Sequence, residues 1–235
     1  MNVISLPDGK NLNIDRKETY RYLGYHFGGS VSADPEIEKM VNELEGKLKA
    51  VVTPRAAYEL YSLSVSNGVC LLFPYDSKDG SEPRNALLSI NSAKLSAHIK
   101  ECRYAILFAA TIGPGADMMI RRYSGRSTVK PAVLQAIGAA AIEAFADEVT
   151  EQIRNEIINS DIFRESEEIG DLDGNDGIGS KVLKMRFSPG YGDFSLEHQN
   201  DFFRILQLEK NLGMSLNSAL LMSPSKSITA VIGVL

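Results

Sequence analysis

A short turn between two apolar runs constrains the fold of this chain more than any other sequence feature. Ser66-Asn67-Gly68 separates the runs 57–64 and 69–73, and both runs have the composition of β-strands. Asn-Gly is the strongest local signal for a tight hairpin, because both residues accept positive φ angles. The two runs are therefore predicted to form adjacent antiparallel strands.

The later strands extend this pattern. A buried strand is predicted over 103–110 and another over 181–187. Two apolar runs near the C-terminus, 218–222 and 227–234, are separated by Pro224-Ser225, which predicts a terminal hairpin. Because strands follow one another as hairpins and do not alternate strictly with helices, we expect an α+β fold with a twisted, mainly antiparallel sheet.

Helical segments flank the predicted strands. Asp15, Asp34 and Ser92 are suitable N-caps for the first three of them. The longest segment has an alanine-rich centre, and we place it in the core because small side chains allow another element to approach closely. The predicted helices are 16–22, a helix that begins at Pro35 and ends before Pro54, 93–100, 116–123, 128–158 and 196–206. Polar loops are predicted at 75–84 and 165–179.

The chain of 235 residues is expected to form one domain, since no linker or repeat divides it. We expect an N-terminal helical part over about 1–52 and a core over about 53–235. Cys70 and Cys102 lie far apart among apolar neighbours, so they are predicted to be reduced core residues and not metal ligands.

Composition argues against several partners. The net charge is −5, and no cluster of Lys and Arg with interleaved aromatic residues is present, which argues against nucleic acid. No apolar run approaches the roughly 20 residues that a membrane span requires. The N-terminus has no signal-peptide pattern, so we expect a cytoplasmic protein with no membrane partner.

The segment 186–193, Arg-Phe-Ser-Pro-Gly-Tyr-Gly-Asp, has the composition of a ligand-binding turn. Arg186 supplies a planar cation that suits a carboxylate. Gly190 allows a ligand to lie against the backbone, and Tyr191 offers a ring face and a hydroxyl. The same composition also fits a turn that only joins a strand to a helix.

Glu143 is the second candidate, because it lies among Ala, Ile and Phe on the long predicted helix. Burying a carboxylate there is costly unless the carboxylate is paired. Two interpretations are open. Glu143 lies at the helix surface or in an ion pair with an arginine, or it faces the Arg186 turn and accepts hydrogen bonds from a ligand.

Two further patterns are weak. Gly113-Pro114-Gly115 follows a strand and opens a helix, as in a Rossmann methyltransferase, but no acidic residue ends a second strand about 20 residues later. We interpret these glycines as turn residues. The run 171–177 is similar to an EF-hand loop, but its glycine falls one position late and Val182 occupies the twelfth position. A solvated loop is expected there.

The turn 186–193, followed by Phe-Ser-Leu-Glu-His-Gln at 194–199, resembles the S-adenosylmethionine-binding turn of the activation domain of vitamin-B12-dependent methionine synthase. The resemblance is strongest over 184–231 and moderate over 102–146. It implies a single curved domain built on a twisted antiparallel sheet with flanking helices. It also implies that Arg186, Ser188, Gly190, Tyr191 and Glu143 bind S-adenosylmethionine, and it assigns no catalytic residue and no metal ligand.

The resemblance implies a role in repair. In the family, this domain presents S-adenosylmethionine for reductive methylation of inactive cob(II)alamin, while a flavodoxin-type protein supplies an electron. The chain lacks the Asp-x-His-x-x-Gly sequence of cobalamin-binding modules, so we expect cobalamin to be carried by a separate corrinoid protein, such as a methionine synthase that lacks its own activation domain. The chain would serve a methyltransferase system for methionine biosynthesis without being catalytic alone.

Two alternatives remain open. The chain ends at Leu235, without the longer C-terminal segment of the family, which favours a docking module for a corrinoid protein or methyltransferase without S-adenosylmethionine chemistry. A weaker alternative is an ordinary Rossmann methyltransferase that uses Gly113 and Gly115.

Overall fold

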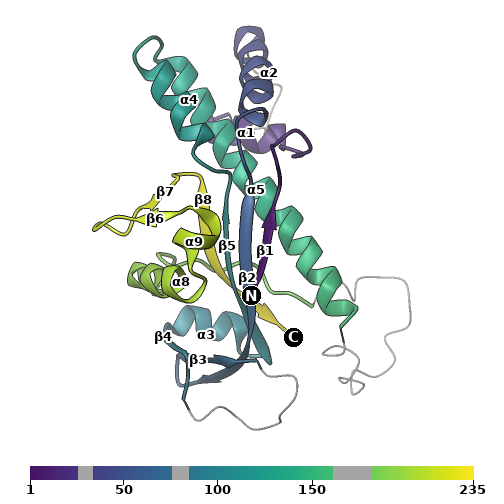
Figure 1. Ribbon diagram of the computed structural model, residues 1–235, viewed down its shortest axis with the longest axis vertical. Coiled ribbons are helices and arrows are strands. Elements are labelled where there is room, and N and C mark those ends of the chain that lie inside the picture. Colours follow the sequence, from purple (N-terminus) through teal and green to yellow (C-terminus); the bar gives the residue numbers. More distant parts are fainter. Residues whose placement is uncertain (26–33, 76–84, 161–181) are drawn as a thin grey trace.

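The computed structural model describes residues 1–25, 34–75, 85–160 and 182–235 and has an elongated shape (Figure 1). Its elements in chain order are β1 (Asn2–Ser5), α1 (Arg16–Tyr22), α2 (Pro35–Lys49), β2 (Arg55–Ser66), β3 (Val69–Pro74), β4 (Leu88–Asn91), α3 (Ala93–Ile99), β5 (Tyr104–Thr111), α4 (Gly115–Ser124), α5 (Val129–Ile158), η1 (Leu196–His198), α8 (Gln199–Ile205), α9 (Leu208–Leu212), β6 (Ser215–Leu216), β7 (Met222–Ser223) and β8 (Ser227–Val234).

A curled sheet forms the middle layer. Its strand order is β4-β3-β2-β5-β8, and β1 pairs with the first residues of β2, beyond the part that pairs with β3. Every pairing within this sheet is antiparallel. The predicted hairpin is confirmed, since Asn67 and Gly68 have φ angles of 50° and 80° and Ser66 pairs with Val69.

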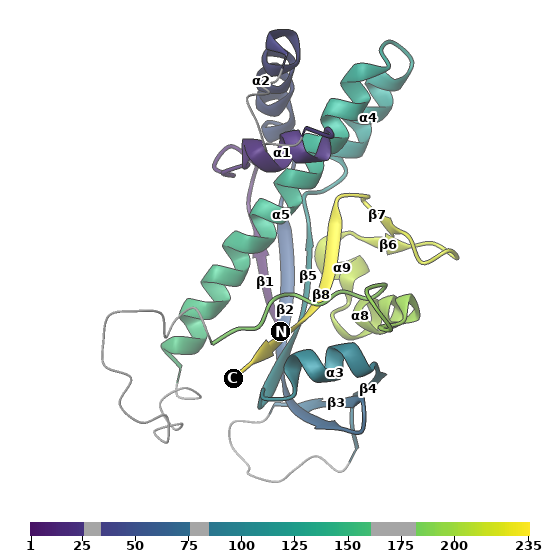
Figure 2. The same cartoon turned by 180° about the vertical axis from the view of Figure 1, so that it is seen from behind.

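Both faces of the sheet are buried, as alternate residues of β5 show. Ile106 and Phe108 pack into one apolar cluster, while Ala105 and Leu107 pack into another on the opposite face. Helix α5 lies along the first face, with α1, α2 and α4 packed around it at one end of the sheet, and α3, α8 and α9 cover the second face (Figures 1 and 2). The predicted α+β fold with a twisted antiparallel sheet and flanking helices is therefore confirmed.

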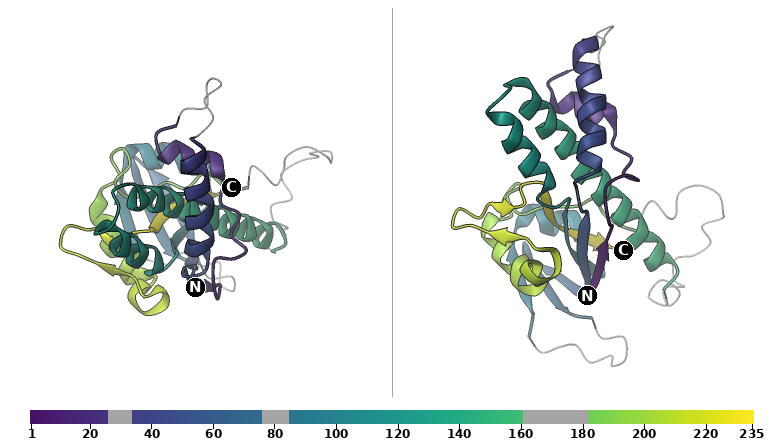
Figure 3. Two further views of the ribbon diagram at one scale, coloured as in Figure 1. Left: turned by 90° about the horizontal axis from the view of Figure 1, so that it is seen from above. Right: turned by 45° about the horizontal axis from the view of Figure 1, so that its top comes forward.

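The long helix α5 organises the first face. Among the described residues it is the one helix long and apolar enough to cross a membrane by length and composition, but 56% of its most apolar window is buried inside the protein. It is therefore a core helix, as its alanine-rich centre predicts. The helices α2 and α4 extend beyond one end of the sheet (Figures 1 and 3).

Helix starts agree with the sequence. Asp15, Asp34 and Ser92 each accept a hydrogen bond from a backbone N–H in the first turn of the helix that follows. Pro54 does not end α2, which already stops at Lys49. The segment predicted as one helix over 196–206 begins with the 3₁₀ turn η1 and continues as α8. Strand β4 and helix α9 were not predicted from the sequence.

The predicted terminal hairpin is wrong. Strand β8 pairs with β5 along its whole length, and residues 218–222 contribute only the start of β7, which pairs with β6. The physical reason is burial on both faces: Ala230, Val231 and Ile232 are all buried, so β8 must lie inside the layered core next to another buried strand.

The described residues leave some of the sequence predictions untested. The predicted loops 75–84 and 165–179 and the EF-hand-like run 171–177 lie outside the described residues, apart from Tyr75. The proposed division into a helical part and a core also stays a prediction, although β1 of the first part pairs with β2 of the second. Cys70 and Cys102 are free and buried in the core, and burial raises the pKa of Cys102 to about 11.

Candidate functional site

The segment before the Arg186 turn is irregular. Within the described residues 182–187, two isolated bridges join it to β8, Leu183 with Val234 and Phe187 with Val231, so the regular strand predicted over 181–187 is wrong in this part. From Leu183 to Phe187 the segment advances four residues, while β8 advances three, from Val234 to Val231. The extra residue in the segment prevents a continuous ladder of hydrogen bonds. Met185 lies within the irregularity and is 82% exposed.

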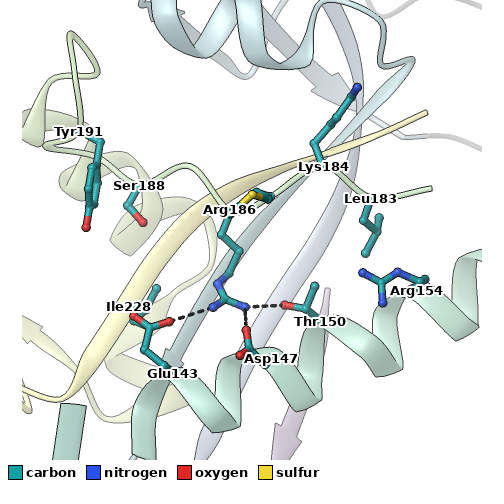
Figure 4. Close-up of a pocket in the computed structure, with 11 residues that line it drawn as sticks. Glu143, Asp147, Thr150, Arg154, Leu183, Lys184, Arg186, Ser188, Tyr191 and Ile228 are labelled. Atoms are coloured by element: carbon teal, nitrogen blue, oxygen red, sulfur yellow. Dashed lines mark hydrogen bonds and ion pairs between the residues drawn. The ribbon is translucent and has the colours of Figure 1, made fainter. Parts of the chain in front are cut away.

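Arg186 points from this irregular segment onto α5 (Figure 4). One of its terminal nitrogens donates to Glu143 Oε2 at 2.9 Å. The other donates to the Thr150 hydroxyl at 3.1 Å and forms an ion pair with Asp147 Oδ1 at 2.8 Å. Arg186 keeps 18% of its side-chain surface exposed, so α5 fixes the guanidinium in a partly shielded position.

The α5 residues beside Arg186 form a polar stripe along one face of the helix. Glu143, Asp147, Thr150 and Arg154 are spaced by four, three and four residues, which places them along one face. Sequence reasoning found Glu143 and missed the other three. The helical spacing of polar residues within an alanine-rich helix is the signal that could have identified them.

Beside the Arg186 cluster lies a cavity of about 430 Å³. Its walls come from α5, the irregular segment, the turn and β8 (Figure 4). Of the predicted site residues, Glu143, Arg186, Ser188 and Tyr191 line it. The other lining residues are Asp147, Thr150, Arg154, Leu183, Lys184, Met185 and Ile228. Tyr191 is 69% exposed and leaves its ring accessible.

Gly190 shapes the turn and does not line the cavity. Its φ angle is 94°, in the region that favours glycine, and its N–H donates to the Phe194 carbonyl at 2.8 Å. The Tyr191 N–H donates to the Ser188 carbonyl at 3.2 Å. These two bonds fold the turn so that Ser188 and Tyr191 both reach the cavity wall.

Asp193 anchors the turn to the rest of the protein. Its carboxylate accepts hydrogen bonds from the Ser92 hydroxyl at 2.5 Å and from the Ala93 and Lys94 N–H groups at the start of α3. The Ser92 bond, with these backbone N–H groups, lowers the pKa of Asp193 below its usual value. The next residue, Phe194, is buried and stacks on Phe187 at 6.3 Å between ring centroids.

Glu143, Asp147 and Arg186 together carry more negative than positive charge, while Arg154 and Lys184 add two cations elsewhere on the cavity wall. Two carboxylates, Glu143 and Asp147, face one guanidinium, and their side chains are 44% and 70% exposed. Both earlier interpretations of Glu143 therefore describe it in part, since it pairs with an arginine and also faces the turn. Exposed carboxylate oxygens at a cavity wall favour a ligand with a cationic group.

The Gly113-Pro114-Gly115 turn needs its glycines for close packing and not for ligand binding. A Cβ at Gly113 would lie 2.3 Å from Thr53 Oγ1, and a Cβ at Gly115 would lie 2.1 Å from the Val51 carbonyl oxygen. These glycines allow two backbone segments to pack closely. Because the described sheets contain only antiparallel pairs, the βαβ unit of a Rossmann methyltransferase is not found in them.

Comparison with known proteins gives two findings and one negative result. A sequence model of the family "Vitamin B12 dependent methionine synthase, activation domain" matches residues 90–234. A solved structure titled "Crystal Structure of the MetH Reactivation Domain bound to AdoHcy" superposes with a TM-score of 0.70 at 17% sequence identity, covering 100% of this chain and 78% of that chain. A search of curated proteins gave no match. Because the family match spans more than half of the sequence, the chain belongs to the family of activation domains of vitamin-B12-dependent methionine synthase.

Proposed function

We propose that the chain is an S-adenosylmethionine-binding reactivation subunit that supports reductive methylation of cob(II)alamin on a separate corrinoid protein. Family membership and the fold shared with a reactivation domain that binds AdoHcy support this proposal. The observation that carries it is the cluster of Arg186, Glu143 and Asp147 on the wall of the 430 Å³ cavity, beside an exposed tyrosine.

The residues of the cavity fit S-adenosylmethionine in charge and shape. A cavity of about 430 Å³ lies within the range of small-molecule sites, roughly 300–1,000 Å³. The carboxylates of Glu143 and Asp147 suit the ligand's ammonium and sulfonium charges. The guanidinium of Arg186 suits its carboxylate, and the exposed ring of Tyr191 suits adenine or the sulfonium.

The chain's contribution to the reaction is binding and orientation. The bound S-adenosylmethionine supplies a methyl group on a good leaving group. Glu143, Asp147 and Arg186 fix the amino-acid end of the ligand. Tyr191 and Ser188 limit its position at the turn. Holding the methyl group close to the partner's cobalt raises its effective concentration there, which accelerates the transfer. Cobalamin is carried by the partner, an electron comes from a flavodoxin-type donor, and the complex works in the cytoplasm in methionine biosynthesis.

A reactivation assay tests this function. A cobalamin-dependent methionine synthase without its own activation domain is poised as cob(II)alamin and mixed with reduced flavodoxin and S-adenosylmethionine, with and without this chain. We expect the absorbance of methylcobalamin to appear only when the chain is present. Equal methylation without the chain would contradict the proposal.

The docking-module alternative predicts a different outcome in the same system. The chain would bind the corrinoid protein with an affinity that does not change when S-adenosylmethionine is added, and methylcobalamin would not form. Calorimetric titration of the chain into the corrinoid protein, with and without S-adenosylmethionine, separates the two functions. A ligand-dependent affinity supports the reactivation subunit.

A further inference from the structure

A second cavity lies where α4 begins beside the end of α2. It measures about 540 Å³ and we call it the arm cavity. Its lining residues are Val51, Thr53, Pro114, Gly115, Met118, Met119 and Arg122. Apart from Thr53 and Arg122, every side chain in the lining is apolar or absent.

The apolar lining is open to solvent. Met118 is 61% exposed and Val51 is 44% exposed, and these are among the most exposed large apolar side chains of the described residues. Methionine is flexible and polarizable, so it adapts to different apolar partners at binding surfaces. The arm cavity therefore offers a ready place for an apolar side chain of another molecule.

Basic residues lie at the arm cavity and along the helix that leads from it: Arg122 lines the cavity, Arg121 is its neighbour on α4, and Arg126 follows the end of α4, and we call these three arginines the rim. Arg121, Arg122 and Arg126 are exposed, and none of their side chains makes a hydrogen bond or ion pair within the described parts of the chain. No acidic residue occurs between Asp117 and Glu143, although the whole chain has a net charge of −5. The side chain of Asp117 is itself occupied, because it accepts hydrogen bonds from Ser225.

No glutamate of the neighbouring helix α2 forms an ion pair with these arginines within the described parts of the chain. Two of its glutamates are already paired along the helix, Glu43 with Lys47 at 2.5 Å and Glu45 with Lys49 at 2.8 Å. Pairs of this kind at i, i+4 satisfy both charges locally. The three arginines therefore keep their positive field for an outside partner.

We propose that the arm cavity is a docking site for an acidic segment of a partner protein, which inserts an apolar side chain between Val51 and Met118 and pairs its carboxylates with Arg121, Arg122 and Arg126. Arginine beside an apolar pocket is typical of the residues that dominate protein interfaces. Nucleic acid is disfavoured because the arginines lie beside an apolar cavity that has no aromatic lining residue. A membrane is disfavoured because the exposed apolar side chains, Val51 and Met118, line a cavity and do not form a continuous apolar face of a long helix.

This docking site is separate from the ligand cavity. The two cavities have no lining residue in common. A change at the arm cavity should therefore leave S-adenosylmethionine binding intact. The two proposals can fail independently, because one is measured with the ligand and the other with a peptide.

The test uses fluorescence anisotropy with the full chain and a short fluorescein-labelled helical peptide that has leucines on one face flanked by glutamates. The matched probe replaces each glutamate by lysine. The variants are Arg122→Glu and Met118→Asp, and the control is Lys17→Glu, a charge reversal at an exposed lysine on α1. Far-UV circular dichroism confirms that each variant is folded.

We expect saturable binding of the acidic peptide, at least about ten-fold weaker binding in each arm variant, and no change in the control. The lysine peptide should not bind. The proposal is overturned if the acidic peptide does not bind the wild type, or if it binds all variants equally. Stronger binding to a single-stranded oligonucleotide or to anionic vesicles than to the acidic peptide would also overturn it.

Discussion

Two glycine-containing turns of this protein follow a strand or extended segment and precede a helix, but they differ in what surrounds them. The turn at Gly113 and Gly115 is pressed against the backbone of Thr53 and Val51, with no room for a side chain. The turn at Gly190 faces a cavity, and a Cβ there would meet only Leu196 Cδ1, at 3.4 Å. The first turn uses glycine for packing, and the second uses it for backbone shape.

The difference shows what kind of group each turn can bind. The first turn lies against Val51 and Thr53 and contributes Pro114 and Gly115 to the mostly apolar arm cavity. At the second turn the neighbours are Arg186, Glu143 and Asp147, whose charges are balanced only in part and remain open to solvent. Similar local sequences therefore support different roles because of what lies opposite them in the fold.

The largest expected effect is on stability, from Gly115→Leu. The new side chain would collide with the Val51 carbonyl, which is backbone and cannot rotate away. We expect a loss of about 3 kcal/mol or more in the free energy of unfolding, measured by urea denaturation. Gly46→Leu is the matched control, because a Cβ at Gly46 meets nothing within 4 Å, and that variant should be no less stable than the wild type.

The next effect is on ligand binding, from Arg186→Ala. Removing the guanidinium releases Glu143 and Asp147 from their ion pairs and, in the proposed binding mode, takes away the partner of the ligand's carboxylate. We expect S-adenosylmethionine affinity to fall by about 2 kcal/mol or more while the melting temperature changes little. Arg204→Ala, which removes an exposed ion-paired arginine outside the cavity, should keep full affinity.

A smaller effect is expected from Gly190→Ala. Alanine at a φ angle of 94° is strained, although the space around it is open. We expect about 1 to 2 kcal/mol of destabilisation. Gly115→Leu tests the effect of a steric collision, and Gly190→Ala tests the effect of backbone strain. Equal losses in the free energy of unfolding would contradict the distinction between the two turns. Thermal unfolding of both variants in one buffer is the measurement.

The smallest effect concerns pH and Asp193→Asn. Hydrogen bonds from Ser92 and the start of α3 hold the pKa of Asp193 below its usual value. A lowered pKa in the folded state adds stability above the unfolded value of about 3.9, and this stability is lost as the pH falls through the folded value. The variant should therefore have a lower melting temperature than the wild type at pH 7. The difference between the two melting temperatures should disappear as the pH falls through the folded-state pKa of Asp193. A difference that persists below the folded pKa would contradict this role.

Much of the fold could be predicted from sequence because its signals are local. The turn at Asn67-Gly68, the caps at Asp15, Asp34 and Ser92, and the long apolar helix α5 each depend on residues close in the chain. The partner of β8 could not be predicted this way. Strand β5 lies more than a hundred residues earlier, and only the packing of both sheet faces selects it.

Some residues of the candidate site could likewise be predicted from the local sequence, and others could not. Ser188, Gly190 and Tyr191 belong to one short turn, and Arg186 and Glu143 could be nominated from charge in unusual surroundings. Asp147 and Thr150 were missed, because their relevance comes from the direction in which Arg186 points. That direction depends on the extra residue between the two bridges to β8, which no local pattern reveals.

The most direct test of the central claim is calorimetric titration of the isolated chain with S-adenosylmethionine, repeated with Glu143→Gln and with the Arg204→Ala control. We predict saturable binding by the wild type and the control, and binding weakened by at least about ten-fold in Glu143→Gln, because one of the two carboxylates that face the ligand's cationic end is lost. Equal affinity in all three proteins would contradict the assignment of this cavity as the S-adenosylmethionine site.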